Sequence, residues 1–184
     1  LLAVHYSVGV EANAFFTASR IPRVFFDAVF ASAIAACFIP VFSEYLQTKG
    51  TKEAYRFAGS FITIITLLTA GLSILGMLFP GPLVALFADY ADPQTTALAV
   101  SLTRVMFPTV LFSGIAFSLV GVLQAQDHFT APALMSALSN SVIILYFLFF
   151  DRTMGIYGLA AAYLLGWLLQ GLIQIPPLCR LGYR

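Results

Sequence analysis

The sequence has few charged residues, which make up only 9% of its 184 positions, against about 25% in a typical soluble domain. So few charges could not cover the surface of a soluble domain of this size. Hydrophobic residues make up 60% of the chain, and the mean hydropathy is +0.94. The composition therefore predicts an integral membrane protein.

The sequence also lacks the motifs of common enzymes. It has no glycine-rich phosphate loop ending in lysine, no two-histidine zinc motif and no serine nucleophile elbow, and its acidic residues are scattered. A net charge of +1 provides no basic face for nucleic acid. The two cysteines, Cys37 and Cys179, lie far apart, and we interpret both as packing residues. We expect a protein that moves or holds a molecule without catalysis and without a cofactor.

Long hydrophobic runs supply the architecture, because a helix needs about 20 mainly apolar residues to cross the hydrocarbon core. The sequence predicts an all-α polytopic helical bundle, a single transmembrane domain over 1–184 with about five full spans. One of these is a long helix that we expect to be kinked near Pro22 or Pro40. The predicted segments are the end of an earlier helix at 1–8, the long helix at 10–45, and spans at 57–79, 97–123, 131–150 and 155–178.

The loop charges orient this predicted bundle. Loops on the expected outer side carry Arg152 beside three aspartates, and the 80–96 connector is expected at the outer surface. By the positive-inside rule, the 46–56 loop, the 124–130 loop and the C-terminus should be cytoplasmic. The basic residues on that side are Lys49, Lys52, Arg56, Arg180 and Arg184.

A polar stripe runs along the first half of the long helix. A helical residue turns by about 100°, so Asn13, Thr17, Arg20 and Asp27 share one face, and Arg23 lies at its edge. Ionisable residues in membrane helices normally face a bundle interior or a water-filled cavity. We therefore predict that these five residues bind substrate, with Arg20 as the main receptor for an anionic group because guanidinium matches phosphate well.

Structural roles for the polar residues stay open at this stage. Arg23 and Asp27 are spaced i, i+4, so they could form a structural ion pair, or both could reach an interface. Arg104 could line the cavity or anchor its helix near the outer surface. The amides of Asn140, Gln170 and Gln174 are expected to form interhelical hydrogen bonds.

Three long stretches of the sequence carry a resemblance to known proteins. They are "ANAFFTASRIPRVFFDAVFASAIAACFIPVFSEY", "TRVMFPTVLFSGIAFSLVGVLQAQDHFTAPAL" and "GIYGLAAAYLLGWLLQGLIQIPPLCRLG". They resemble the MurJ/MviN lipid II flippases, within the multidrug/oligosaccharidyl-lipid/polysaccharide exporter superfamily, and the similarity runs almost the full length of the chain. Pro22, Pro40 and the pair Glu44-Tyr45 match the family's second-helix pattern. The chain departs from the pattern at Asn13 and at Phe26-Asp27, so its cavity should be less cationic.

The resemblance implies the first, N-terminal lobe of a two-lobed exporter fold, whose second helical lobe we expect elsewhere in the same protein. It also implies transport of undecaprenyl-diphosphate-linked sugar-peptide, the lipid II used in peptidoglycan and cell-wall biogenesis, across the bacterial inner membrane by alternating access. The expected partners are this lipid and the surrounding membrane lipids. The alternatives are a related exporter of another polyprenyl-linked oligosaccharide or a drug, and a non-transporting scaffold of the cell-wall machinery.

Overall fold

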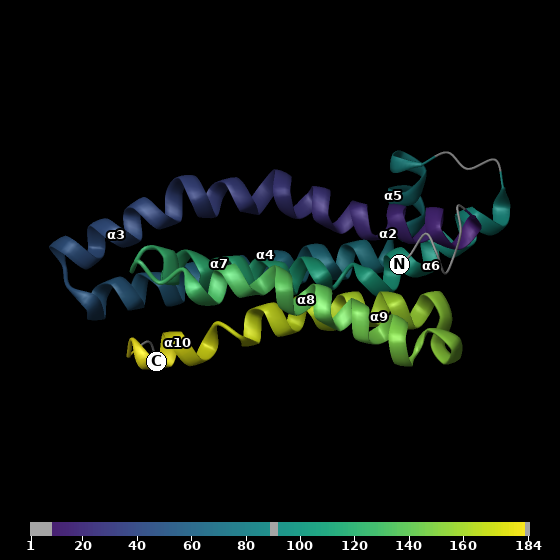
Figure 1. Cartoon of the computed structure of the whole chain (residues 1–184). Coiled ribbons are helices and arrows are strands. Elements are labelled where there is room, and N and C mark those ends of the chain that lie inside the picture. The colour runs from purple at the N-terminus through teal and green to yellow at the C-terminus, as the bar shows by residue number, and fades with distance from the viewer. Residues whose placement is uncertain (1–8, 89–91, 183–184) are drawn as a thin grey trace.

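Helices form all of the regular secondary structure in residues 9–88 and 92–182, the ranges that this computed structural model describes (Figure 1). The expected all-α fold is confirmed. The predicted helix end at 1–8 lies outside the described residues, as do Asp89 and Arg184.

One long helical rod runs from residue 10 to residue 48 along one edge of the molecule (Figure 1). It comprises α2 (Val10–Phe26), two π-helical turns at Asp27–Ala31 and Ile34–Phe38, and α3 (Ile39–Thr48). The rod covers the range predicted for the long helix, whose crossing of the membrane stays a prediction, and its irregularity takes the form of widened turns between Pro22 and Pro40. Pro40 has no N–H, and its ring crowds the carbonyl four residues earlier, which favours a widened turn directly before it.

The remaining helices pack alongside this rod or against its neighbours. The α6 and α7 helices are bent by 40° at the break that contains Pro108, within the predicted span 97–123. The bounds are α4 (Thr51–Leu78), α5 (Pro80–Phe87), α6 (Pro93–Met106), α7 (Thr109–Gln124), α8 (Thr130–Phe149), α9 (Asp151–Leu172) and α10 (Ile175–Arg180).

Three helical stretches of the described chain are long and apolar enough to cross a membrane, namely Thr51–Leu78, Thr130–Phe149 and Thr153–Arg180. The bent pair α6–α7 makes a fourth if it is counted as one span. The rod at 10–48 is not among them. A polytopic membrane protein is therefore supported, while the expected number of five full spans stays a prediction.

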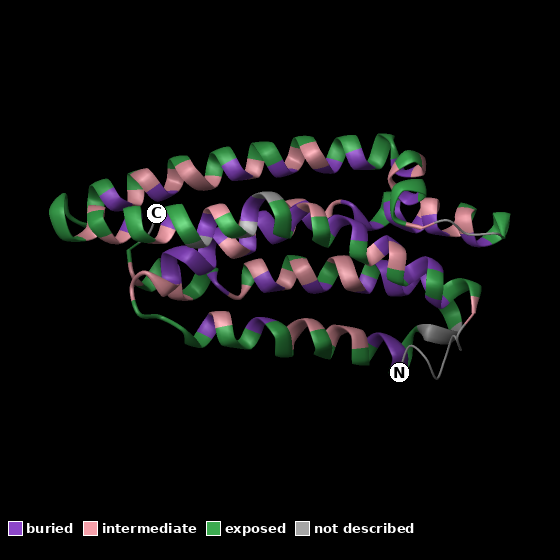
Figure 2. Cartoon of the chain, turned by 90° about the horizontal axis from the view of Figure 1, so that it is seen from above, coloured by how far each residue is buried: buried purple, intermediate pink, exposed green. Residues whose placement is uncertain are grey.

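Two large hydrophobic clusters and a small third one, formed by Ala116, Val120 and Met135, hold the helices of the described chain together. The first joins α2 to α6 and α9 through residues such as Ile21, Leu102 and Leu159. The second joins the π-helical turns and α3 to α4 and α7, and in it the rings of Phe38 and Phe61 stack with centroids 4.4 Å apart. Figure 2 shows buried residues where helices meet and exposed residues on the outward faces.

The cysteines correct one expectation from the sequence. Cys37 and Cys179 are both exposed free thiols, so neither is a packing residue. Cys37 lies on the rod next to the buried Phe38, whose ring takes the inward position at that turn.

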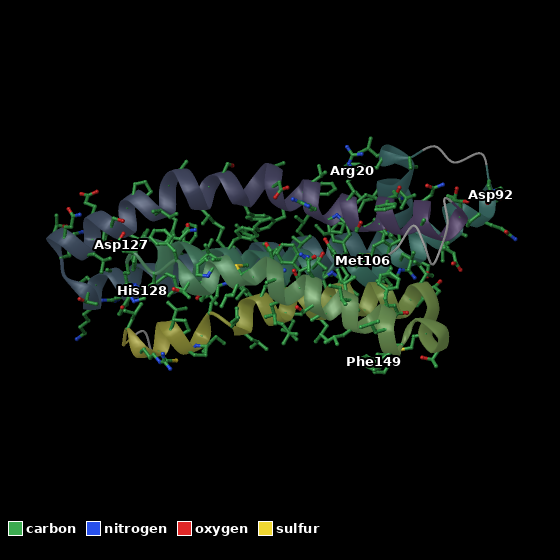
Figure 3. All side chains as sticks on the ribbon, in the orientation of Figure 1. Arg20, Asp92, Met106, Asp127, His128 and Phe149 are labelled. Atoms are coloured by element: carbon green, nitrogen blue, oxygen red, sulfur yellow. The ribbon has the colours of Figure 1, made fainter. Side chains whose placement is uncertain are left out.

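The three segments predicted on one side of the membrane do meet at one end of the bundle. The hydroxyl of Tyr55, near the start of α4, lies 2.9 Å from Gln126 Oε1 and 2.9 Å from the carbonyl oxygen of Leu181, and either can accept its proton. Figure 3 shows Asp127 and His128 at this end and Asp92 at the opposite end. The grouping of the loops is therefore confirmed, although the side of the membrane that each end faces is not.

Candidate functional site

A cleft of about 320 Å³ opens between the rod and the C-terminal helices. The α7 helix contacts both α2 and α9, so it joins the two walls. The lining residues come from α2 and the first π-helical turn, from α7, from α8 and from α9. They are Ser19, Pro22, Arg23, Phe26, Asp27, Thr109, Ser113, Phe117, Ser136, Ser139, Asn140, Ile143, Tyr163, Gly166, Trp167 and Gln170.

The charged groups of the cleft are Arg23 and Asp27, one helical turn apart. Arg23 Nε lies 3.6 Å from Asp27 Oδ2, so the i, i+4 ion pair anticipated from the sequence does form. The side chains stay 71% and 57% exposed, respectively. Ion pairs as exposed as this contribute only about 0–1 kcal/mol to stability. The pair is therefore held loosely, and its charges remain accessible from the cleft.

Arg20 lies outside this cleft. It lines a separate hollow of about 100 Å³ together with Phe16, Thr17 and Phe87 of the short helix α5. Figure 3 shows the Arg20 side chain beside α5. No carboxylate pairs with Arg20 in the described part of the chain. The stripe divides because its members span about 80° of a helix that is packed on two sides. The first π-helical turn begins at the last member of the stripe, Asp27.

The predicted polar stripe therefore separates into groups. Arg23 and Asp27 share the cleft, Thr17 and Arg20 share the hollow, and Asn13 is exposed further toward the start of α2. Substrate contact by these five residues is not tested by the structure and stays a proposal.

Arg104 has a structural contact. Its Nε donates to the carbonyl oxygen of Met77 at 3.1 Å, in the last turn of α4. The final carbonyls of a helix have no partner within the helix, and a cationic donor there also complements the helix dipole. Of the two roles left open by the sequence, the structure supports the anchor.

The three amide side chains differ in their surroundings. Gln174 is fully buried, and its Nε2 lies 3.0 Å from the carbonyl of Ala116 on α7, which confirms its interhelical role. Gln170 is 7% exposed and lines the cleft. Asn140 also lines the cleft and is exposed. Neither of these two amides has a hydrogen-bond partner among the described residues.

The sequence reading missed the uncharged part of the site. The cleft contains hydroxyl groups from four helices and the indole of Trp167, the only tryptophan of the chain. A signal was present, because Ser136, Ser139 and Asn140 follow helical spacing i, i+3, i+4. Tyr163, Trp167 and Gln170 likewise follow i, i+4, i+7 on the next helix. In the sequence alone, each of these two sets of residues is equally typical of ordinary helix packing. The structure shows that both sets face one cleft.

Comparison with known proteins adds a second line of observation. Residues 4–184 match the family model described as "Lipid II flippase MurJ". The chain is 29% identical over 182 residues to the lipid II flippase MurJ of Burkholderia cenocepacia, covering 97% of the chain and 35% of that protein. It is 29% identical over 171 residues to the lipid II flippase MurJ of Thermosipho africanus, covering 92% of the chain and 35% of that protein. The chain thus spans about a third of the length of the curated relatives it matches.

Proposed function

The chain belongs to the lipid II flippase MurJ family, and from this membership we propose that it provides the cleft of a flippase for lipid II. The substrate would be undecaprenyl-diphosphate-linked peptidoglycan precursor, moved across the bacterial cytoplasmic membrane by alternating access. In this role the protein transports a lipid and catalyses no reaction, and its partners are the lipid substrate, membrane lipids and a second helical lobe.

The loosely paired guanidinium of Arg23 in the cleft is the observation that carries the proposal. Arg23 Nε lies 3.6 Å from Asp27 Oδ2, which is longer than a hydrogen bond. No other partner is found for the guanidinium within the described ranges, which leaves its terminal nitrogens available to a ligand. Guanidinium binds phosphate oxygens in a bidentate manner, with bonds about twice as strong as neutral ones. A diphosphate could therefore replace Asp27 as the partner of Arg23 at little cost.

The ends of the bundle give the proposed direction of transport. The end that holds Tyr55, Gln126 and Leu181 also carries Lys49, Lys52 and Arg56, so we assign it to the cytoplasm. Lipid II would be captured there and released on the other side. Moving one charge across the membrane field is worth about 2.3 kcal/mol per 100 mV, enough to bias such a cycle without ATP.

Thr17, Arg20 and Asn13 would act outside the cleft. They lie on the same helix as Arg23, nearer its start, and Arg20 faces the hollow beside α5. We assign to them a supporting contact with the headgroup as it leaves the cleft. Replacing Arg20 by Ala should accordingly reduce transport less than replacing Arg23.

Complementation tests the proposal. The complete reading frame that contains the chain, carrying Arg23→Ala, should fail to rescue cells depleted of their lipid II flippase although the protein reaches the membrane. Arg23→Lys should rescue in part, because an ammonium keeps the charge and loses the bidentate geometry.

The matched control is Arg56→Ala, which removes an exposed arginine near the start of α4, outside the cleft. It should rescue fully. Full rescue by Arg23→Ala would refute the proposed site.

A further inference from the structure

The two sides of the cleft differ in charge. Arg23 and Asp27 lie on the rod, whereas the residues contributed by α7, α8 and α9 are all uncharged. We propose that this uncharged side, here called the neutral wall (Ser113, Ser139, Asn140, Trp167 and Gln170), binds the sugar of the lipid headgroup. The inference rests on the proposed function. It assigns a binding surface to the sugar, whereas Arg23 accounts only for the diphosphate.

Hydroxyl groups around the cleft present acceptors to a ligand. Ser113 donates its proton to the carbonyl of Val110 at 3.0 Å, and Thr109 donates to the carbonyl of Met106 at 2.7 Å. Ser139 points its proton back along α8, toward the carbonyls of Met135 and Ser136 at 3.3 Å each. A hydroxyl whose single proton is already used has only lone pairs left. The hydroxyls of Thr109, Ser113 and Ser139 therefore offer lone pairs to the O–H and N–H donors of a ligand.

The amides supply the complementary groups. Asn140 and Gln170 each carry two N–H donors and a carbonyl acceptor. Gln170 is 7% exposed, and its side-chain amide, which has no hydrogen-bond partner in the described chain, still reaches the cleft that it lines. A ligand in the cleft can therefore bond to this amide directly. Sugar hydroxyls can donate to and accept from such amides at once.

Trp167 offers the remaining feature of a sugar site, a fixed aromatic face. Its ring packs on Phe117 with centroids 6.1 Å apart, and Phe117 packs in turn on Phe26 at 5.2 Å. Gly166 brings α9 close to α8, since a Cβ there would lie 3.3 Å from the Cβ of Ser139. The indole is therefore held in place, and the C–H face of a pyranose can stack on it while the hydroxyls bond to the amides.

The size of the cleft limits what it can hold. A volume of about 320 Å³ lies at the lower end of the range of about 300–1,000 Å³ for small-molecule sites. The cleft therefore accommodates the diphosphate end and the adjoining sugar, and the rest of the headgroup extends beyond it.

Comparison of two lipids tests the inference. The affinity of the complete transporter in nanodiscs would be measured for lipid II and for undecaprenyl diphosphate, which has no sugar. Trp167→Leu and Asn140→Ala should each weaken lipid II binding by about five- to tenfold, the equivalent of one or two lost contacts, and leave undecaprenyl diphosphate unchanged. Tyr157→Leu, an aromatic replacement on α9 outside the cleft, is the control and should change neither.

The outcomes separate this inference from the proposed function. Equal loss for both lipids, or no loss for either in both folded variants, would overturn the sugar assignment. Asn140 is exposed, so Asn140→Ala provides a folded test if Trp167→Leu is unstable. Arg23→Ala should weaken both lipids, and unchanged binding of both would instead contradict the proposed phosphate site.

Discussion

Arg104 shows how one contact decides between an anchoring and a transport role. Arg104→Ala removes the donor to the carbonyl of Met77 and should destabilise the protein by about 0.5–1.5 kcal/mol, the usual worth of one hydrogen bond. Thermal unfolding in detergent would measure the loss. Arg104→Lys keeps a cation that can reach the helix end and should lose less.

Transport should survive both substitutions at Arg104, because the side chain contacts the end of α4 and does not line the cleft. If Arg104→Ala were expressed normally but failed to rescue depleted cells, Arg104 would instead be a substrate contact.

Two glycines of α4 form a matched pair at the residue scale. A Cβ on Gly76 would collide with the buried ring of Phe107, whereas a Cβ on Gly71 would meet nothing within 4 Å. Gly76→Ala should therefore cost about 1–3 kcal/mol through overpacking. Gly71→Ala should be neutral or stabilise by up to about 1 kcal/mol, because alanine is the better helix former.

Unfolding curves of the two glycine variants, collected side by side in the same detergent, would check this prediction. Equal stability of the two would mean that the contact between α4 and the α6–α7 break is looser than the structure shows.

At the scale of the element, Asp92 begins α6. Its carboxylate accepts from the hydroxyl of Thr95 at 2.8 Å and from the backbone N–H groups of Gln94 and Thr95. These bonds hold the pKa of Asp92 below its ordinary value of 3.8, and the bond from the Thr95 hydroxyl contributes most to this shift. Because the folded pKa is lowered, the cap stabilises fully above pH 3.8 and is lost as the pH falls through the lowered pKa.

Asp92→Ala should therefore lower the Tm at neutral pH, and the difference from the parent protein should shrink in strongly acidic buffer. Asp92→Asn keeps a capping side chain that does not titrate, so its Tm relative to Asp92→Ala should not depend on pH. Melting curves recorded between pH 7 and pH 3 would measure the difference in Tm between Asp92→Ala and the parent protein. A difference that stays constant over this range would exclude a capping role for the charge.

The sequence predicted the helices better than it predicted the site. Hydrophobic length predicted α4 and α8 closely, because the length of an apolar run depends on local composition. The cleft depends on which faces of α2, α7, α8 and α9 meet. A charge pattern on one helix identified Arg23 and Asp27 but could not show that Arg20 turns toward α5, nor that Trp167 and Asn140 lie opposite.

At the scale of the whole molecule, the two ends of the bundle should label from opposite sides of the membrane. Lys49→Cys and His128→Cys lie at the end with Tyr55, and Gln94→Cys lies at the other. With Cys37 and Cys179 replaced by Ser, an impermeant maleimide should reach Gln94→Cys in intact spheroplasts. It should reach Lys49→Cys and His128→Cys only in inverted vesicles.

The reverse labelling pattern would invert the proposed direction of transport but would leave the fold unchanged. Labelling of Lys49→Cys and His128→Cys from different sides would contradict the contacts of Tyr55 with Gln126 and Leu181.

The two π-helical turns of the rod have a consequence for how the protein tolerates changes in chain length. A widened turn houses an extra residue within an otherwise regular helix, so shortening the rod by one position there tightens the coil without unfolding it. Such a deletion would leave the residues before and after the turn on their present faces, whereas a deletion in a regular α-helical stretch would rotate one part against the other by about 100°. The stretch from 27 to 38 is therefore where the rod can lose a residue while its charged half and its aromatic half both keep their neighbours.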